Sequence, residues 1–220
     1  MMPLAPAAPA SLVDQAIEGM RTLLASGEWS VGTRIPPEPL LAADLGVSRN
    51  TVREAVKALA HVGVLEVRRG DGTYVAATTE VQALMRRQAE RVDIEHLLEV
   101  RHAIEVRAAA LAAGRRTDGD LELLDTIAAR RLAAIDTGDG PAFVDADVDL
   151  HVAVVAAAHN PLLSELYDGL VETLRASIED PIAGHDPMLA EHAAVVEAIR
   201  RGDADGAAAA SAELLDHVAR

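Results

Sequence analysis

Hydrophobic residues in the first third of the chain recur with the spacing of amphipathic helices. From Ser11, which stands where a helix N-cap is expected, apolar residues return every three or four positions and predict a first helix over 11–26. A short apolar stretch predicts a second helix over 38–45, which Gly46 ends, and a third helix follows over 48–61. The segment is therefore expected to hold three helices joined by turns.

The residues that follow change from helical spacing to the alternation that is typical of strands. Residues 65–68 alternate, 69–72 predict a Gly-containing turn, and 73–75 return as a second strand. Residues 11–78 are thus expected to form one small domain of three helices and a two-stranded wing. Residues 1–10 are rich in Ala and Pro, and we expect them to be a mobile tail.

Beyond residue 78 only helical patterns remain, separated by Gly, Asn-Pro and Asp-Pro. We expect a linker or first helix over 79–92 and an all-helical antiparallel bundle over 93–220. The fold class is therefore mostly α, with the three helices and wing in front of the bundle. The predicted helices cover about 80–90, 93–113, 117–136, 139–158, 160–179, 186–201 and 203–219.

The 220-residue chain has a formal net charge of −15, which taken alone argues against binding nucleic acid. The charge is uneven, because residues 1–79 carry seven basic and eight acidic side chains and the acidic excess lies in 80–220. The first domain must therefore be judged by its own near-neutral charge. The sequence contains no Cys, so only His, Asp or Glu could hold a metal. No apolar run approaches the ~20 residues of a membrane span, and we expect a cytoplasmic protein without a membrane partner.

Basic side chains gather where a DNA-reading helix would need them. Arg49, Arg53 and Lys57 are four residues apart and form a stripe beside the apolar face of the third predicted helix. That helix follows a short turn at Gly46, the order of a helix-turn-helix, whose second helix enters the major groove. A solvated surface is the alternative explanation of a charged stripe, but its position between this turn and a basic wing favours DNA binding.

Three stretches resemble the winged helix-turn-helix of GntR-family bacterial transcription regulators. They are residues 27–36, 45–56 and 70–75, and the resemblance covers about 11–78. One departure is Pro39, which stands where many members have an Arg after the Glu of the second helix, so the operator need not match the family's commonest one. The resemblance implies DNA contacts from Ser48, Arg49, Asn50, Thr51, Arg53, Arg69 and Gly70.

The second domain resembles the all-helical effector domain of the FadR subfamily, called the FCD domain, over about 93–217. Residues 98–105, 147–151 and 191–203 carry the resemblance. It implies a homodimer that responds to a small-molecule effector, and we expect this effector to be a carboxylate. Arg101 is a candidate ligand for such an anion, and its alternative role is a helical ion pair with Glu105, four residues on.

Asp147 and His151 are four residues apart beside apolar neighbours, so both are expected to point into the bundle, where buried polar groups need partners. With His192 from another helix they are candidate ligands of zinc, nickel or manganese, and hydrogen-bonded core residues are the alternative. The family's fourth ligand is a His, but here that position is Leu214, which cannot coordinate a metal. His217 lies about one turn further on and could replace it only with a local shift.

The expected function is a ligand-responsive transcription regulator, a repressor, that binds an inverted-repeat DNA operator as a dimer and is not an enzyme. Two alternatives belong to other classes: a metal-dependent enzyme that uses Asp147, His151 and His192, and a helical ligand-binding module that has lost DNA binding. The sequence shows no nucleophile elbow or phosphate loop, which argues against the first. The retained Arg49 and Arg53 argue against the second.

Overall fold

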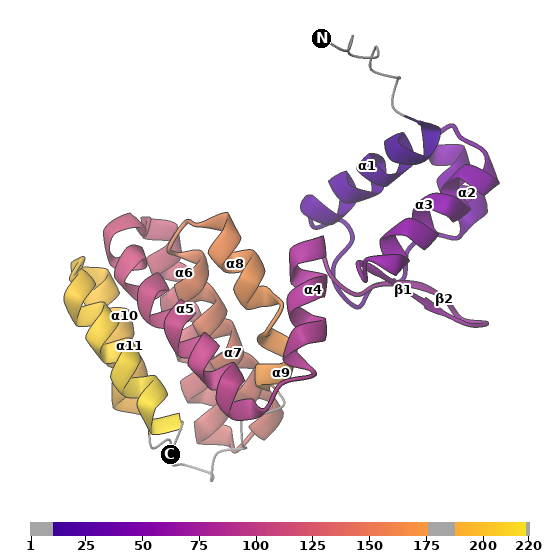
Figure 1. Cartoon of the computed structure of the whole chain (residues 1–220). Helices are drawn as coiled ribbons and strands as arrows, with labels where there is room; N and C mark the ends of the chain where they lie inside the picture. Colours follow the sequence, from indigo (N-terminus) through magenta and orange to yellow (C-terminus); the bar gives the residue numbers. More distant parts are fainter. Residues whose placement is uncertain (1–10, 176–187, 219–220) are drawn as a thin grey trace, which may run out of the picture. The chain divides into compact units, whose positions relative to one another are not determined.

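The computed structural model describes residues 11–175 and 188–218, and the chain divides into two compact units, 1–84 and 85–220. The predicted tail over 1–10 lies outside the described residues. Helices dominate both units, and the strands belong to the first (Figure 1). Within the described ranges, no helix combines the length and the apolar character that crossing a membrane requires.

The first unit contains the predicted three helices and two-stranded wing. Its core is formed by the apolar faces of the helices, with Met20 and Val52 fully buried, and by Trp29 from the connector after the first helix. The described elements are α1 (Leu12–Ala25), α2 (Glu38–Asp44), α3 (Arg49–His61), β1 (Leu65–Arg68) and β2 (Gly72–Val75).

Local capping rules explain where the first helices begin and turn. Ser11 Oγ accepts a hydrogen bond from the Asp14 amide at 3.1 Å, and the Asp14 carboxylate accepts one from the Ser11 amide at 3.2 Å, so α1 starts with a capping box. Gly46 has a φ of +66°, a conformation that residues with a Cβ avoid, and it allows the tight turn between α2 and α3.

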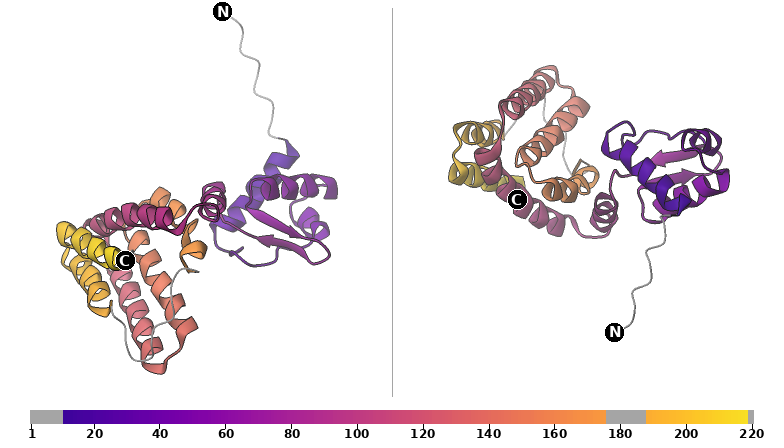
Figure 2. Two further views of the ribbon diagram at one scale, coloured as in Figure 1. Left: turned by 60° about the horizontal axis from the view of Figure 1, so that its bottom comes forward. Right: turned by 90° about the horizontal axis from the view of Figure 1, so that it is seen from above.

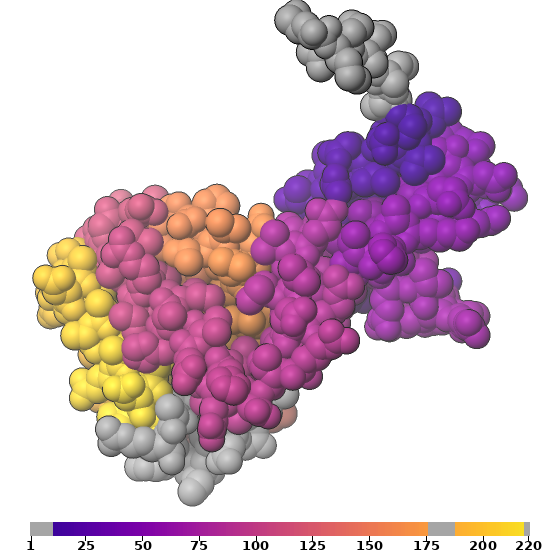
Figure 3. Space-filling model, viewed as in Figure 1, coloured from indigo at the N-terminus to yellow at the C-terminus, as the bar shows by residue number. Residues whose placement is uncertain are grey.

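The wing is an antiparallel hairpin in which Leu65 pairs with Val75 and Arg68 with Gly72. It projects from the helices of the first unit (Figures 2 and 3). Leu65 and Val75 anchor its base in the core, whereas the residues at its tip are exposed. The side chains at the tip therefore do not contribute to the core of this unit.

The second unit is an all-helical bundle, as predicted. In it α5 packs against α7, α10 and α11, and α6 packs against α7. Figures 1 and 2 show α10 and α11 side by side along α5. The helices, of which α4 begins in the first unit, are α4 (Glu80–Ala89), α5 (Ile94–Arg115), α6 (Asp118–Thr137), α7 (Gly140–Ala156), α8 (Pro161–Asp168), α9 (Val171–Arg175), α10 (Leu189–Arg201) and α11 (Ala204–Val218).

Small side chains form the contact of α5 with its neighbours in the bundle. Ala108, Ala109, Ala112 and Ala113 are all fully buried, and Ala207 of α11 is fully buried as well. Methyl groups at these positions let the helix backbones approach closely at the packing density of a protein interior. We call these five residues the alanine seam.

One predicted helix is divided in the structure. The sequence predicts a single helix over 160–179, but α8 ends at Asp168 and α9 begins at Val171. Gly169 and Leu170 are both buried between them, and the Leu170 amide donates to Tyr167 O at 2.8 Å, three residues back, so the chain makes a tighter turn there. The ends of the predicted helices at 176–179, 186–187 and 219 lie outside the described residues.

Candidate functional site

The predicted DNA-contacting residues of α3 are held by a local cap. Ser48 Oγ accepts a hydrogen bond from the Thr51 amide at 3.1 Å and lies 2.9 Å from Thr51 Oγ1. Arg49 and Asn50 follow the cap and are exposed. The start of α3 therefore presents backbone amides, two hydroxyls and a cation on one surface, which suits phosphate and base edges.

The two arginines of this helix are in different states. Among the described residues Arg49 makes no ion pair, whereas Arg53 donates from Nε and Nη2 to Glu38 Oε2 at 3.1 and 2.8 Å. Glu38 is the first residue of α2, where the helix dipole favours a carboxylate. Sequence reasoning missed Glu38, because its partner lies fifteen residues away on another helix.

The structure explains Pro39 and places the other predicted cation at the wing. Pro39 is exposed at the start of α2, where its fixed φ suits a helix and its missing N–H costs nothing.

In the hairpin, Arg68 stacks on the Tyr74 ring at 4.1 Å and pairs with Glu66 at 2.9 Å. Arg69 makes no ion pair within the described part of the chain, so it is the available cation beside Gly70 at the tip.

The second unit brings Asp147 and His151 of α7 together with His192 of α10, as the sequence predicts. All three are at least 93% buried. His192 Nε2 lies 3.3 Å from Asp147 Oδ1, the two Nε2 atoms lie 3.4 Å apart, and His151 Nε2 lies 3.8 Å from Asp147 Oδ2. We call these three residues the Asp–His–His cluster.

Hydrogen bonds on the far side of each ring fix which imidazole nitrogen carries the proton. His151 Nδ1 lies 2.7 Å from Glu105 Oε2, and His192 Nδ1 lies 2.8 Å from Met188 O. A carboxylate and a carbonyl only accept, so both Nδ1 atoms donate, and both Nε2 atoms are turned toward the Asp147 carboxylate. Such outer partners orient metal-binding histidines in proteins.

Burial and neighbouring charges set the ionisation of the cluster. Burial lowers the pKa of His151 by more than Glu105 raises it, so its ring is neutral at pH 7. Burial alone would raise the pKa of Asp147, but the contact with His192 and the nearby positive groups, Arg131 among them, hold it well below its usual value. The cluster therefore combines the Asp147 carboxylate and a neutral His151 imidazole with His192 beside them.

The donor set fits a divalent metal. Ligand atoms that each lie about 2 Å from a tetrahedral zinc ion are about 3.3 Å from one another, close to the separations of 3.3, 3.4 and 3.8 Å found here. Without a cation, two lone pairs and a carboxylate would face each other in a buried site. A cation or a proton between them removes that repulsion.

The fourth family position is closed to a metal. Leu214 of α11 is buried and lines a cavity of about 10 Å³ together with His151, His192 and Ser211. A cavity of this volume holds about one water molecule, so it admits no effector. His217 is exposed and its Nδ1 lies 3.7 Å from Glu191 Oε1, so it is not part of the cluster.

Arg101 takes the ion-pair role that its spacing also allowed. It is 3% exposed, and its Nε donates to Glu105 Oε1 at 2.6 Å. Tyr167 Oη donates to the same oxygen at 2.6 Å, and His151 and Arg101 together lower the Glu105 pKa to about 2 although burial opposes this. Arg101 thus supports the orientation of His151 through Glu105.

Sequence reasoning missed Arg131, although a signal for it exists. It lies at 2% exposure between Ile127 and Ile135, which are buried at four-residue spacing on the same face of α6, and its Nε donates to Asp147 Oδ1 at 2.7 Å. A charged residue in the middle of an apolar helix face needs a buried counter-ion. Asp147 supplies that counter-ion.

Two family models match the chain. The model described as "Bacterial regulatory proteins, gntR family" matches residues 12–75, and the model described as "FCD domain" matches residues 93–217. The first contains α3 and the wing, and the second contains the Asp–His–His cluster.

Relatives and solved structures agree with these matches. The chain is 34% identical over 216 residues to the putative L-lactate dehydrogenase operon regulatory protein of Escherichia coli K12, covering 90% of this chain and 81% of that protein. It is 30% identical over 212 residues to the HTH-type transcriptional regulator LutR of Bacillus subtilis, covering 89% and 93%. The structure of Streptococcus agalactiae GntR aligns with a TM-score of 0.63 at 29% identity, covering 94% and 99%.

Proposed function

Because the chain belongs to the gntR family of bacterial regulatory proteins and carries an FCD domain, we propose that it is a repressor that binds an inverted-repeat operator as a homodimer. It is a DNA-binding transcription regulator, and the relatives named above are transcription regulators rather than enzymes. We assign DNA binding to 11–78 and effector binding and dimerisation to 93–220.

The observation that carries the DNA-binding assignment is the capped start of α3. There Arg49 is exposed and makes no ion pair among the described residues, and a bidentate contact from it to guanine would discriminate by about 1–3 kcal/mol. Ser48, Asn50, Thr51 and Arg53 complete that surface, and Arg69 and Gly70 supply the wing contact.

We propose that Asp147, His151 and His192 hold a zinc, nickel or manganese ion. When bound, that ion would supply open coordination positions for an effector and a fixed positive charge. Glu105 and Met188 O would keep the two rings turned toward it.

Charge balance supports an anionic effector. Arg101 is offset by Glu105, and Arg131 by Asp147, so these four buried charges cancel. A divalent ion beside neutral imidazoles would then leave two uncompensated positive charges in a buried site, which a carboxylate ligand would reduce. One relative is named for an L-lactate dehydrogenase operon, and we infer a 2-hydroxycarboxylate or a related small acid for this chain. Its effect on DNA binding is limited by its differential affinity for the two dimer states.

Replacing Arg49 with alanine tests the DNA-binding proposal. We expect affinity for the chain's own upstream DNA to fall by about tenfold or more, with little change on unrelated DNA, because a base contact is lost in each half-site. Fluorescence anisotropy titration measures both affinities. Arg21→Ala, which removes an exposed α1 cation paired with Glu18, is the control and should bind as wild type. Equal losses for the two variants would contradict the assignment.

Replacing Glu38 with glutamine tests whether Glu38 restrains Arg53. We expect tighter binding to unrelated DNA and a salt dependence steeper by about 0.9 per subunit, because the released guanidinium can neutralise one more phosphate. The preference for the operator should fall. Glu18→Gln removes the same charge from the same domain and should leave the salt dependence unchanged. An unchanged salt dependence for Glu38→Gln as well would mean that the Glu38–Arg53 ion pair does not restrain Arg53.

A further inference from the structure

A groove beside the candidate metal centre has the shape and polarity of a binding site for an aliphatic acid. It lies between α6 and α10, has a volume of about 310 Å³ and includes Leu150 of α7. Among its lining residues Arg131 and His192 are 2% and 6% exposed, and both contact Asp147. The groove therefore reaches the Asp–His–His cluster. Its buried polar lining residues, Arg131 and His192, are the ones that contact Asp147.

The rest of the groove is mainly aliphatic and partly open to solvent. Leu132 of α6 is 43% exposed and Leu189 of α10 is 41% exposed, so each of these helices contributes a partly exposed leucine to the groove. Val196 and Ala193 of α10 extend this surface. A hydrocarbon chain would cover these side chains, whereas a hydroxyl group placed against them would lose its hydrogen bonds to water without replacement.

The charged residues of the groove favour binding of the acid group at the centre. Arg200 is already paired with Asp125 and lies 3.5 Å from Glu197. A ligand carboxylate near Arg200 would lie beside two acidic side chains, Asp125 and Glu197, and would be repelled by them. At Arg131 and His192 it meets the positive charge that a metal-loaded centre would carry.

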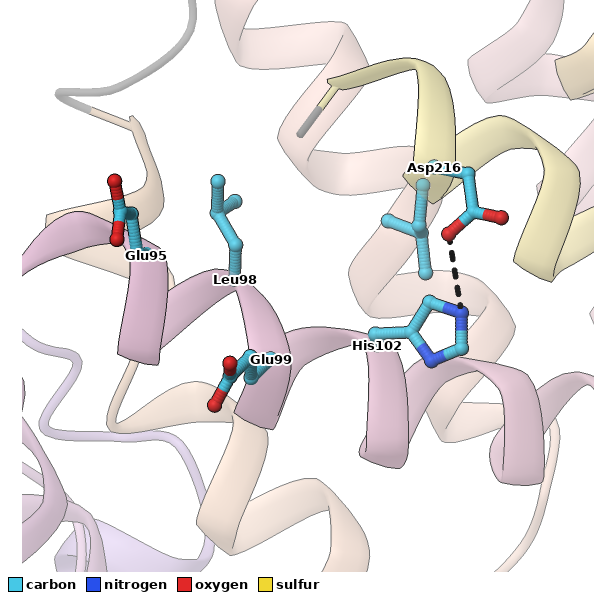
Figure 4. A pocket seen from close by; sticks show the side chains of 6 residues that line it. Glu95, Leu98, Glu99, His102 and Asp216 are labelled. Carbon is cyan, nitrogen blue, oxygen red and sulfur yellow. Dashed lines mark ion pairs between the residues drawn. The ribbon is translucent and has the colours of Figure 1, made fainter. Parts of the chain in front are cut away.

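The larger cavity of the same unit does not suit an acid. It has a volume of about 420 Å³, and its lining includes Glu95, Glu99 and Asp216, the last paired with His102 at 3.8 Å (Figure 4). Three carboxylates repel an anion. This cavity also contains none of the residues of the Asp–His–His cluster.

We propose that the α6–α10 groove binds the hydrocarbon chain of an aliphatic monocarboxylate whose acid group lies at Arg131 and His192. This inference rests on the proposed effector function and deepens it, because it selects aliphatic acids over polyhydroxylated sugar acids. Ala193 sets the length of chain that fits, since any larger side chain at this position occupies the groove.

The test uses calorimetric titration of the full-length protein with straight-chain 2-hydroxycarboxylates from lactate to 2-hydroxyoctanoate. We expect affinity to rise by up to about fourfold for each added methylene until the groove is filled. Ala193→Phe should remove this gain in affinity with chain length. The matched control is Ala194→Phe, at the exposed next position on α10 outside the groove, which should keep the wild-type series.

The outcomes separate this inference from the function on which it rests. An affinity that does not change with chain length, or equal series for Ala193→Phe and Ala194→Phe, overturns the groove assignment while carboxylate binding stands. If no acid of the series binds and none alters operator affinity, the carboxylate effector is wrong as well. Far-UV circular dichroism, which is dominated by the helices of the second unit, shows whether that unit is folded in the Ala193→Phe variant.

Discussion

Replacing Glu105 with glutamine is expected to lower the free energy of unfolding of the helical domain by about 3–5 kcal/mol. The carboxylate is 3% exposed and accepts from Arg101, Tyr167 and His151 at 2.6, 2.6 and 2.7 Å. A neutral amide of the same size leaves the Arg101 guanidinium, which is equally buried, without a counter-charge. It also places N–H groups where donors already point.

The sequence provides a way to measure this loss in one domain. Its single Trp, Trp29, lies in the core of the first unit, so Trp fluorescence follows that unit, whereas far-UV circular dichroism is dominated by the helices of the second. Glu105→Gln should shift the dichroism transition in urea and leave the fluorescence transition in place. Glu122→Gln, at an exposed position of α6, should shift neither by more than about 0.5 kcal/mol. A wild-type dichroism midpoint for Glu105→Gln would mean that Arg101 needs no buried partner.

Replacing His151 with alanine is expected to abolish metal binding and the stability that metal provides. Protein purified without chelator should contain about one divalent ion per chain, and the variant almost none, because two ligands remain in a site that Leu214 closes on the α11 side. At a free metal concentration 1,000 times the Kd, binding stabilises the folded state by about 4 kcal/mol, and this increment should vanish in the variant.

Mass spectrometry of the metal content and calorimetric melting with and without chelator measure the two effects. His96→Ala removes an exposed His of α5 outside the cluster and should retain both the metal and the stabilisation. A wild-type protein that is free of metal and equally stable after chelation would contradict the metal proposal. The Asp–His–His cluster would then be a hydrogen-bonded core.

The winged domain follows from the sequence because local rules determine most of it. The cap at Ser11, the turn at Gly46 and the alternation of β1 each depend on residues within four positions of one another. The helical bundle is also predicted as a class from its periodicity. The division between α8 and α9 is not, because it depends on burying Leu170 against distant helices.

The candidate sites show the same difference between local and distant information. Asp147 and His151 can be paired from their spacing, and Ser48 and Arg49 from their place at a helix start. Long-range pairs leave no such spacing: the place of Arg131 on an apolar helix face indicates that it needs a counter-ion, but the sixteen residues to Asp147 and the forty-six from Glu105 to His151 do not identify the partners. The second partners of both sites, Glu38 included, become visible only when helices are placed side by side.

The alanine seam has a consequence for how this protein can diverge. A methyl group at Ala109 or Ala112 already fills its space, so larger side chains there would overpack the contacts of α5 and cost about 1–3 kcal/mol each. Leu132, Leu189 and Ala193 of the α6–α10 groove are exposed to solvent and have no such limit. Related proteins that acquire new effectors should therefore carry substitutions at Leu132, Leu189 and Ala193 while the alanine seam stays unchanged. The groove is thus the part of the domain in which ligand specificity can change without loss of the fold.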